Sequence, residues 1–148
     1  MAEYFINEYL RDNELYFLGP GSTVKAITDI LGLSKTLLGV DALYNRKIVA
    51  FDLGESEILE LINNYGNAYI VITVIGRQGY IFGRGNQQFT PRVVRSIGGK
   101  DRIYVIATRS KMRSIKYLII DTGDPKLDED LSGYWRVIVG FNEEKIVK

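Results

Sequence analysis

Short apolar runs alternate along the chain with segments in which apolar residues recur at helical spacing. The run Ala68–Ile75 is apolar on both faces and rich in β-branched residues, which is typical of a central strand in a parallel sheet. The segment Val24–Leu31 has helical periodicity instead, and Gly32 is a typical helix stop. The same patterns predict strands at 14–18, 36–40, 47–51, 102–107, 117–120 and 134–139, and helices at 56–62, 91–97, 110–114 and 127–131.

Residues at the predicted boundaries support this division of the chain. Ser56 is expected to cap one helix, and Thr90 followed by Pro91 is expected to cap the next. Asn45 and Arg46 mark a turn between two strands. The opening stretch 2–11 has aromatic residues at helical spacing and is either a helix or an interdomain connection.

Alternation of strands with helices predicts an α/β fold, with a mostly parallel, Rossmann-like sheet flanked by helices. The length of 148 residues fits a single α/β domain over 1–148. In such sheets ligands bind outside the carboxyl ends of the strands. The loops that follow the predicted strands are therefore the first places to look for chemistry.

Composition excludes several kinds of chemistry. The sequence has neither cysteine nor histidine, so thiolate chemistry, disulfides, histidine bases and the commonest metal ligands are all ruled out. Carboxylates, lysine, hydroxyls, backbone amides and a divalent ion held by oxygen ligands remain available, and no residue is assigned as a metal ligand. No apolar run reaches the roughly 18 residues that span a bilayer, and the first residues are acidic, so we expect a cytoplasmic protein without a membrane partner.

A net charge of +1 conceals an uneven distribution of charge. The segment 77–116 has ten basic residues and one acid, Asp101, and such a block can steer anionic ligands. The alternative is a solvated basic face that acidic segments balance in space. Nucleic acid is an improbable partner, because the net charge is close to neutral and no RNA-binding signature occurs.

The loop Gly19–Thr23 separates a predicted strand from a predicted helix. The start of a helix has unpaired amides and the positive end of the helix dipole, so it favours an anion. This is not a Walker loop, because the Gly-Lys-Ser/Thr ending is missing. The alternative to a phosphate-binding loop is an ordinary strand-to-helix turn with a serine or threonine cap. The residues expected to bind phosphate here are Gly19, Gly21, Ser22, Thr23 and Lys25.

The loop 76–88 is rich in glycine and also contains arginine and amide side chains. Glycines allow close approach of the backbone to a ligand, arginine can bind phosphate or carboxylate oxygens, and amides both donate and accept. The alternative is a glycine-rich hairpin whose arginines face water. The expected ligand-binding residues are Gly76, Gln78, Gly79, Arg84, Gly85, Asn86 and Gln87.

Carboxylates form a third group at predicted strand ends. Asp121 and Asp124 follow one strand together with Thr122, and Asp41 follows another. Carboxylates there can act as a base, bond ribose hydroxyls or hold magnesium. The catalytic candidates are Asp41 and Asp121, with Thr122 and Asp124 as ligand-binding residues. A turn-initiating aspartate at 121 and a buried turn acceptor at 41 are the alternatives.

Taken together, several segments in order resemble the C-terminal half of the ATP-NAD kinase-like family related to acetoin-catabolism proteins. The resemblance runs from about Leu15 to Phe141, and the long glycine-arginine-asparagine motif makes it fairly specific. It implies a cytoplasmic nucleotide-binding protein that transfers phosphate from ATP to NAD, with Mg²⁺ as an accompanying ion. The segments that carry it are 18–27, 37–41, 76–87, 105–108 and 121–124.

One departure from this family bears on mechanism. NAD kinases carry a Gly-Gly-Asp-Gly-Thr motif in an N-terminal domain, and this sequence has no such motif. The resemblance therefore implies an N-terminal kinase domain as a partner, in cis or in trans, and a chain that is inactive by itself. The loops also resemble those of sugar-phosphate isomerase and deaminase domains, so a phosphosugar-binding or isomerase-like domain is one alternative, and a structural or homo-oligomerising domain is another.

Overall fold

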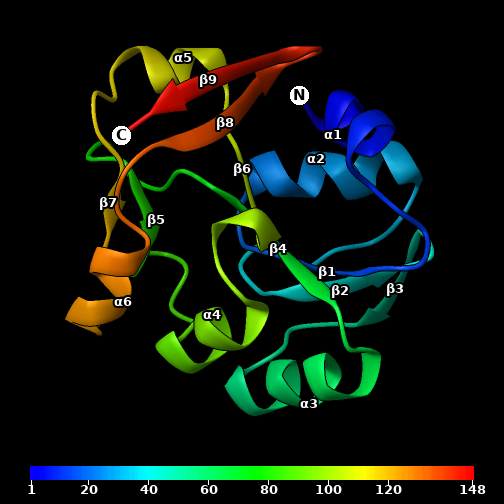
Figure 1. Cartoon of the computed structure of the whole chain (residues 1–148). Coiled ribbons are helices and arrows are strands. Elements are labelled where there is room, and N and C mark those ends of the chain that lie inside the picture. Colours follow the sequence, from blue (N-terminus) through cyan, green and yellow to red (C-terminus); the bar gives the residue numbers. More distant parts are fainter.

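The structure is a computed structural model that describes all residues from Met1 to Lys148. The chain forms two sheets, six α-helices and one short 3-10 turn (Figure 1). The helices are α1 (Ala2–Glu8), α2 (Ser22–Leu31), α3 (Glu55–Tyr65), α4 (Pro91–Ile97), α5 (Arg109–Arg113) and α6 (Pro125–Asp130), with the 3-10 turn η1 (Lys100–Arg102). The strands are β1 (Leu15–Leu18), β2 (Asp41–Tyr44), β3 (Lys47–Ala50), β4 (Ala68–Thr73), β5 (Tyr80–Phe82), β6 (Ile103–Ile106), β7 (Ile119–Ile120), β8 (Trp135–Gly140) and β9 (Glu143–Val147).

The main sheet has seven strands in the order β3-β2-β1-β4-β6-β8-β9. Its four central strands, β1, β4, β6 and β8, are mutually parallel, and antiparallel strands extend the sheet at both edges. Strands β5 and β7 form a separate two-stranded parallel sheet. The predicted α/β fold with a mostly parallel, Rossmann-like sheet is confirmed.

Helices cover both faces of the main sheet. Helices α1 and α2 lie on one face, and α3 and α4 lie on the other (Figure 1). Side chains that alternate along β1 enter two different apolar clusters: Leu15 and Phe17 pack on the α3 side, whereas Tyr16 and Leu18 pack on the α1 side. This alternation explains why the central strands are apolar at every position. None of the helices has the length and apolar character that a membrane crossing requires.

Two predicted helix boundaries are confirmed by their caps. Gly32 ends α2 in the left-handed conformation, with φ of 72°. Thr90 caps α4 through a hydrogen bond that its hydroxyl accepts from the Val93 amide, and Pro91 occupies the first helical position. Asn45 and Arg46 form the predicted turn between β2 and β3, both with positive φ.

Other local predictions were wrong. Residues 36–40 form a loop rather than a strand, because their polar groups bond to buried side chains and not to a neighbouring strand. Helix α3 begins after Gly54, and its capping group is the side chain of Glu57 rather than Ser56. Three strands escaped prediction: β2, which begins at Asp41 rather than ending before it, β5 within the glycine-rich loop, and β9 in the charged C-terminal segment.

Candidate functional site

A cavity of about 200 Å³ opens at the carboxyl ends of β1, β4 and β6, which are neighbours in the sheet. This is the edge at which ligands bind to open α/β sheets. Three segments meet there: the start of α2, the residues that follow β4, and the start of α5. The lining residues are Gly21, Ser22, Thr23, Thr73, Val74, Ile75, Gly76, Thr108 and Lys111.

The start of α2 is not capped by any side chain. By contrast, Thr90, Thr108 and Asp124 cap α4, α5 and α6, and Glu57 reaches back to the start of α3. The residue before α2 is Gly21, with φ of 108°. The amides of the first turn of α2 are therefore left without the protein acceptor that these other helices have, and they lie at the positive end of the helix dipole.

Polar side chains around the cavity also have unused hydrogen-bonding capacity. The hydroxyls of Ser22, Thr23 and Thr73 make no hydrogen bond to the protein, and the ammonium group of Lys111 makes no ion pair. Thr73 is only 7% exposed, and its side chain lies beside Gly21, where a Cβ at residue 21 would be 3.4 Å from Thr73 Cγ2. Thr108 is different, because its hydroxyl accepts the Lys111 amide at 3.2 Å and caps α5.

No carboxylate lines this cavity. The only charged side chain in its lining is the cation Lys111, and the remaining polar groups are hydroxyls and backbone. The carboxylates of the chain do not gather in groups of three or more that could hold a metal ion. A cavity with this set of donors suits an anion with several oxygen atoms, and it offers no carboxylate ligand for Mg²⁺.

Only some residues of the predicted first phosphate loop line the cavity. Gly21, Ser22 and Thr23 do so, whereas Gly19 is buried against Ile72 and the backbone of β4. Lys25 pairs with Asp29 one turn further along α2, with Nζ 2.7 Å from Oδ1. The cation beside the loop is thus Lys111 rather than Lys25.

The second loop contributes only its first residue, Gly76, to the cavity. Its remaining residues fold with β5 against β7 and do not line the cavity, although Gly85 packs against Ile75, which does. Arg84 donates to Gln78 at 3.2 Å, Gln87 is exposed, and Gly79 and Gly85 pack closely against neighbouring residues. Asn86 is fully buried, and its amide donates to the Ile81 carbonyl at 2.9 Å, which fixes the shape of the loop.

The third predicted group lies around the start of α6 and not at the cavity. Asp124 caps α6 and pairs with Arg95 at 2.7 Å, and this arginine lowers the pKa of the Asp124 carboxyl. Thr122 bonds to Asp128 through both its amide and its hydroxyl. Asp121 is exposed and lies outside the cavity lining.

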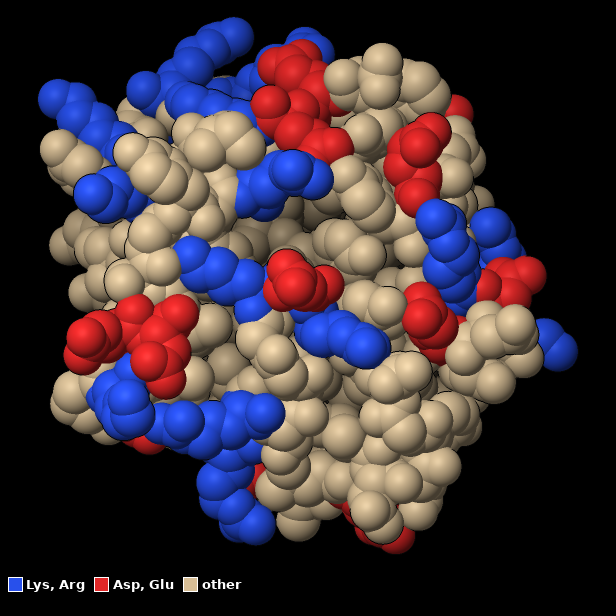
Figure 2. All heavy atoms as spheres, viewed as in Figure 1, with Lys and Arg blue, Asp and Glu red and all other residues tan.

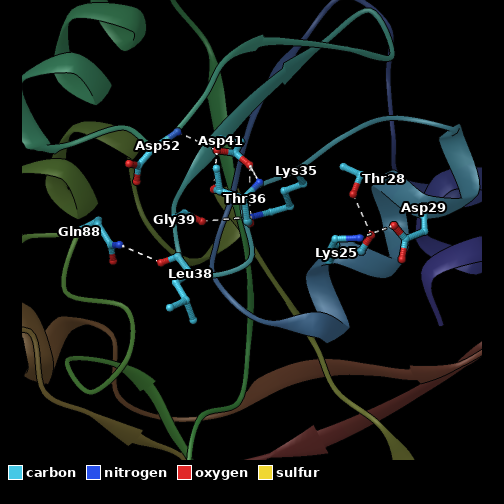
Figure 3. A network of polar contacts seen from close by, with 10 residues as sticks. All are labelled: Lys25, Thr28, Asp29, Lys35, Thr36, Leu38, Gly39, Asp41, Asp52 and Gln88. Carbon is cyan, nitrogen blue, oxygen red and sulfur yellow. Dashed lines mark hydrogen bonds and ion pairs between the residues drawn. The ribbon is translucent and has the colours of Figure 1, made fainter.

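Asp41 lies in a buried network that includes Lys35 (Figure 3). Both side chains are fully buried, with Lys35 Nζ 3.6 Å from Asp41 Oδ2. Asp41 accepts the Thr36 amide at 2.7 Å, the Thr36 hydroxyl at 2.8 Å and the Asp52 amide at 2.8 Å. Burial lowers the pKa of Lys35, although the Asp41 carboxylate opposes that shift. Asp41 is therefore a buried hydrogen-bond acceptor of this turn, which was the alternative to a catalytic role for this residue.

This buried network supports the cavity indirectly. Lys35 Nζ donates to the carbonyls of Thr36 and Gly39, which fixes the loop between α2 and β2. The Leu37 carbonyl of that loop accepts the Gly21 amide at 2.8 Å. The conformation of Gly21, and with it the open start of α2, is thereby tied to the buried pair.

The basic block 77–116 does not form a uniform basic face. Figure 2 shows basic side chains gathered near α5 and acidic side chains interleaved with other cations on the same face. Arg92 pairs with Glu55, Arg95 with Asp124 and Arg109 with Glu143. Acidic residues from distant segments thus balance several of these cations, and Lys111 is the one that lines the cavity.

Two larger hollows, of about 460 and 490 Å³, lie near the amino ends of the parallel strands. They share Tyr9 and Tyr104, and each is lined by both acidic and basic side chains. Tyr9 already donates to Glu144 at 2.6 Å, and Glu14 accepts from Tyr69 at 3.0 Å. Several of their polar groups are thus already paired within the protein, whereas most polar side chains of the smaller cavity are free, so chemistry favours the smaller cavity.

The fold and the cavity define an α/β domain of the Rossmann-like kind, with a donor-lined hollow at the carboxyl edge of its parallel strands. A family model for the ATP-NAD kinase C-terminal domain matches residues 11–148, and the chain belongs to this family. The resemblance found in the sequence is thus confirmed. Neither a curated protein nor a solved structure gives a significant match to the chain.

Five lining residues were not predicted, and three of them are polar: Thr73, Thr108 and Lys111. Thr73 is the single threonine in β4, whose other residues are aliphatic or tyrosine, and this is a usable local signal. Thr108 and Lys111 follow β6 at the same edge of the sheet. Their place just after a central strand is the signal that identifies both as candidate site residues. The glycine-rich composition of the second loop is a more conspicuous signal, but it marks residues that mostly lie outside the cavity.

Proposed function

We propose that the chain is a nucleotide- or phosphate-binding domain of an ATP-NAD kinase-like protein, and that it binds a phosphate group in the cavity between α2, β4 and α5. The observation that carries this proposal is the uncapped start of α2 facing free hydroxyls and one free cation, with no carboxylate in the lining. Amides at a helix start and a lysine ammonium are common partners of phosphate oxygens.

ATP, NAD and NADP are the ligands that membership of the family suggests. Phosphorylation of NAD itself requires a metal, a positioned acceptor hydroxyl and two bound substrates. Because the cavity has no carboxylate, Mg²⁺ would arrive with the nucleotide phosphates. We therefore propose that transfer depends on an N-terminal kinase domain, in cis or in trans, and takes place in the cytoplasm.

The proposal is tested by thermal unfolding of the purified chain with ATP, NAD, NADP and a panel of sugar phosphates, with and without Mg²⁺. A ligand that binds only the native state raises the unfolding temperature as its concentration rises. Ser22→Ala combined with Thr23→Val should reduce that rise, whereas Lys25→Met, which changes a cation outside the cavity, should not. No rise with any compound at millimolar concentration would sink the proposal and favour a structural or oligomerising role.

A phosphosugar is the second candidate ligand, and the size of the cavity favours it. About 200 Å³ is below the range of roughly 300–1,000 Å³ that drug-sized ligands occupy. The cavity thus suits one phosphate group with a small part of the molecule attached to it. Asp41 and Asp121 do not line it, so we propose binding of a phosphosugar here and not its isomerisation.

A further inference from the structure

We infer that Thr73 and Lys111 make this cavity selective for a terminal phosphate, a group with three free oxygens, over the internal diphosphate of a dinucleotide. The inference rests on the proposed function and goes beyond it by naming two residues and the kind of phosphate that they recognise. Both residues line the cavity, and neither has a partner in the protein for its functional group.

Thr73 is the more informative of the two. The residue is only 7% exposed at the end of β4, and its hydroxyl makes no hydrogen bond within the protein. The hydroxyl is not one of the fully buried polar atoms that lack a partner, so its oxygen is accessible from the surface and open to a ligand. Thr73 lines the cavity, where a ligand oxygen can accept a hydrogen bond from its hydroxyl.

Lys111 supplies the charge of the cavity. It lies in the first turn of α5, is half-buried, and is the only ionisable side chain in the lining. Other cations of the basic block, such as Arg109 and Arg95, are held by carboxylates. Lys111 is thus free to form a charge-assisted hydrogen bond with an anion.

The donors come from three segments of the chain: the α2 start, Thr73 at the end of β4 and Lys111 in α5. A terminal phosphate presents three free oxygens, so each segment can be matched by one of them. An internal phosphate of NAD has two free oxygens and is bonded to the rest of the molecule on both sides. The small volume of the cavity also favours a group that enters as the end of a ligand.

The test compares NADP with NAD, because these molecules differ by one terminal phosphate, and uses inorganic phosphate and ATP as further probes. Affinities are measured by calorimetry on the full chain and its variants. NADP should bind at least tenfold more tightly than NAD. Thr73→Val and Lys111→Met should each weaken NADP binding by about ten- to a hundredfold, as expected for the loss of a hydrogen bond to a charged group. Thr73→Ser should retain binding.

Two controls separate binding from folding. Lys116→Met removes an exposed cation that does not line the cavity, and it should leave affinity unchanged. Thr73→Val should unfold at the same temperature as the wild type, or higher, without ligand, because the hydroxyl that it removes is unpaired. A purely structural role for Thr73 predicts a lower temperature instead.

The outcomes distinguish this inference from the proposed function. If NADP binds the wild type and both variants equally, the inference is overturned while phosphate binding at the α2 start stands. If NAD binds as tightly as NADP, selectivity for a terminal phosphate is overturned. If no probe binds the wild type, both the proposed function and the inference fail.

Discussion

The buried pair of Lys35 and Asp41 makes the sharpest prediction about stability. Asp41→Asn preserves the shape of the side chain but removes its charge, and it replaces one acceptor oxygen with a donor. The Lys35 ammonium then remains buried with only the carbonyls of Thr36 and Gly39 around it. In addition, the new NH₂ group replaces one of the two acceptor oxygens. If it replaces Oδ2, the Thr36 amide loses its acceptor; if it replaces Oδ1, the Thr36 hydroxyl and the Asp52 amide lose theirs.

The magnitude follows from the burial of both partners. Breaking a buried ion pair by removing one partner costs about 3–5 kcal/mol, because the other charge is left uncompensated. For a chain of this length, each kcal/mol lowers the unfolding temperature by roughly 2–4 °C, so Asp41→Asn should lower it by roughly 6–20 °C. The double variant with Lys35→Met should lose less than the sum of the two single variants, since it leaves no unpaired charge.

The assay is reversible unfolding in urea, with Asp29→Asn as the matched control. Asp29 also pairs with a lysine, Lys25, but on the exposed surface of α2, so its loss should cost only about 0.2–0.5 kcal/mol. A loss of less than about 1 kcal/mol for Asp41→Asn would refute the reasoning that the buried pair anchors the loop. Reduced turnover of a phosphosugar without loss of stability would instead support a catalytic Asp41.

Two further predictions concern backbone space and pH. Gly83→Ala should destabilise the protein by more than Gly98→Ala, as measured by urea unfolding. Both glycines have positive φ, but only at residue 83 would a Cβ collide with a backbone atom, the Asp121 carbonyl oxygen. Equal losses of stability in the two variants would contradict this prediction. Burial, together with a hydrogen bond to Glu144, raises the pKa of Tyr9 above its ordinary value of 10.0, so the folded state retains a proton that the unfolded state loses above that pH. The contribution of Tyr9 to stability should therefore be complete below pH 10 and decline above it, and Tyr9→Phe should reduce that decline; an unchanged alkaline profile in this variant would count against the prediction.

Local signals in the sequence were sufficient for most of the fold. The apolar character of Ala68–Ile75 identified β4 as central, because a strand between two parallel neighbours is buried on both faces. Thr90 with Pro91, and Gly32, located helix ends, because capping depends on residues within one turn. The loop at 36–40 was misread as a strand because its apolar residues resemble a strand, while the groups that hold it, Lys35 and Asp41, act through tertiary contacts.

The candidate site was only partly predictable. The first loop was found, because an unusual turn between a strand and a helix is visible locally. The glycines of the second loop mainly permit close packing: at Gly83, for example, a Cβ would collide with Asp121. Glycine-rich composition has the same appearance whether the backbone approaches a ligand or another part of the chain.

The sequence by itself determined the alternation of strands and helices, the family, and the absence of cysteine and histidine chemistry. Only the tertiary structure decided which residues surround the cavity. Parallel pairing of β1 with β4, and of β4 with β6, aligns the ends of three strands that are far apart in the chain, and this alignment brings Gly21, Thr73 and Lys111 together. Burial of Asp41 was decided in the same way, since a carboxylate is withdrawn from water only where distant donors and a buried cation compensate its charge.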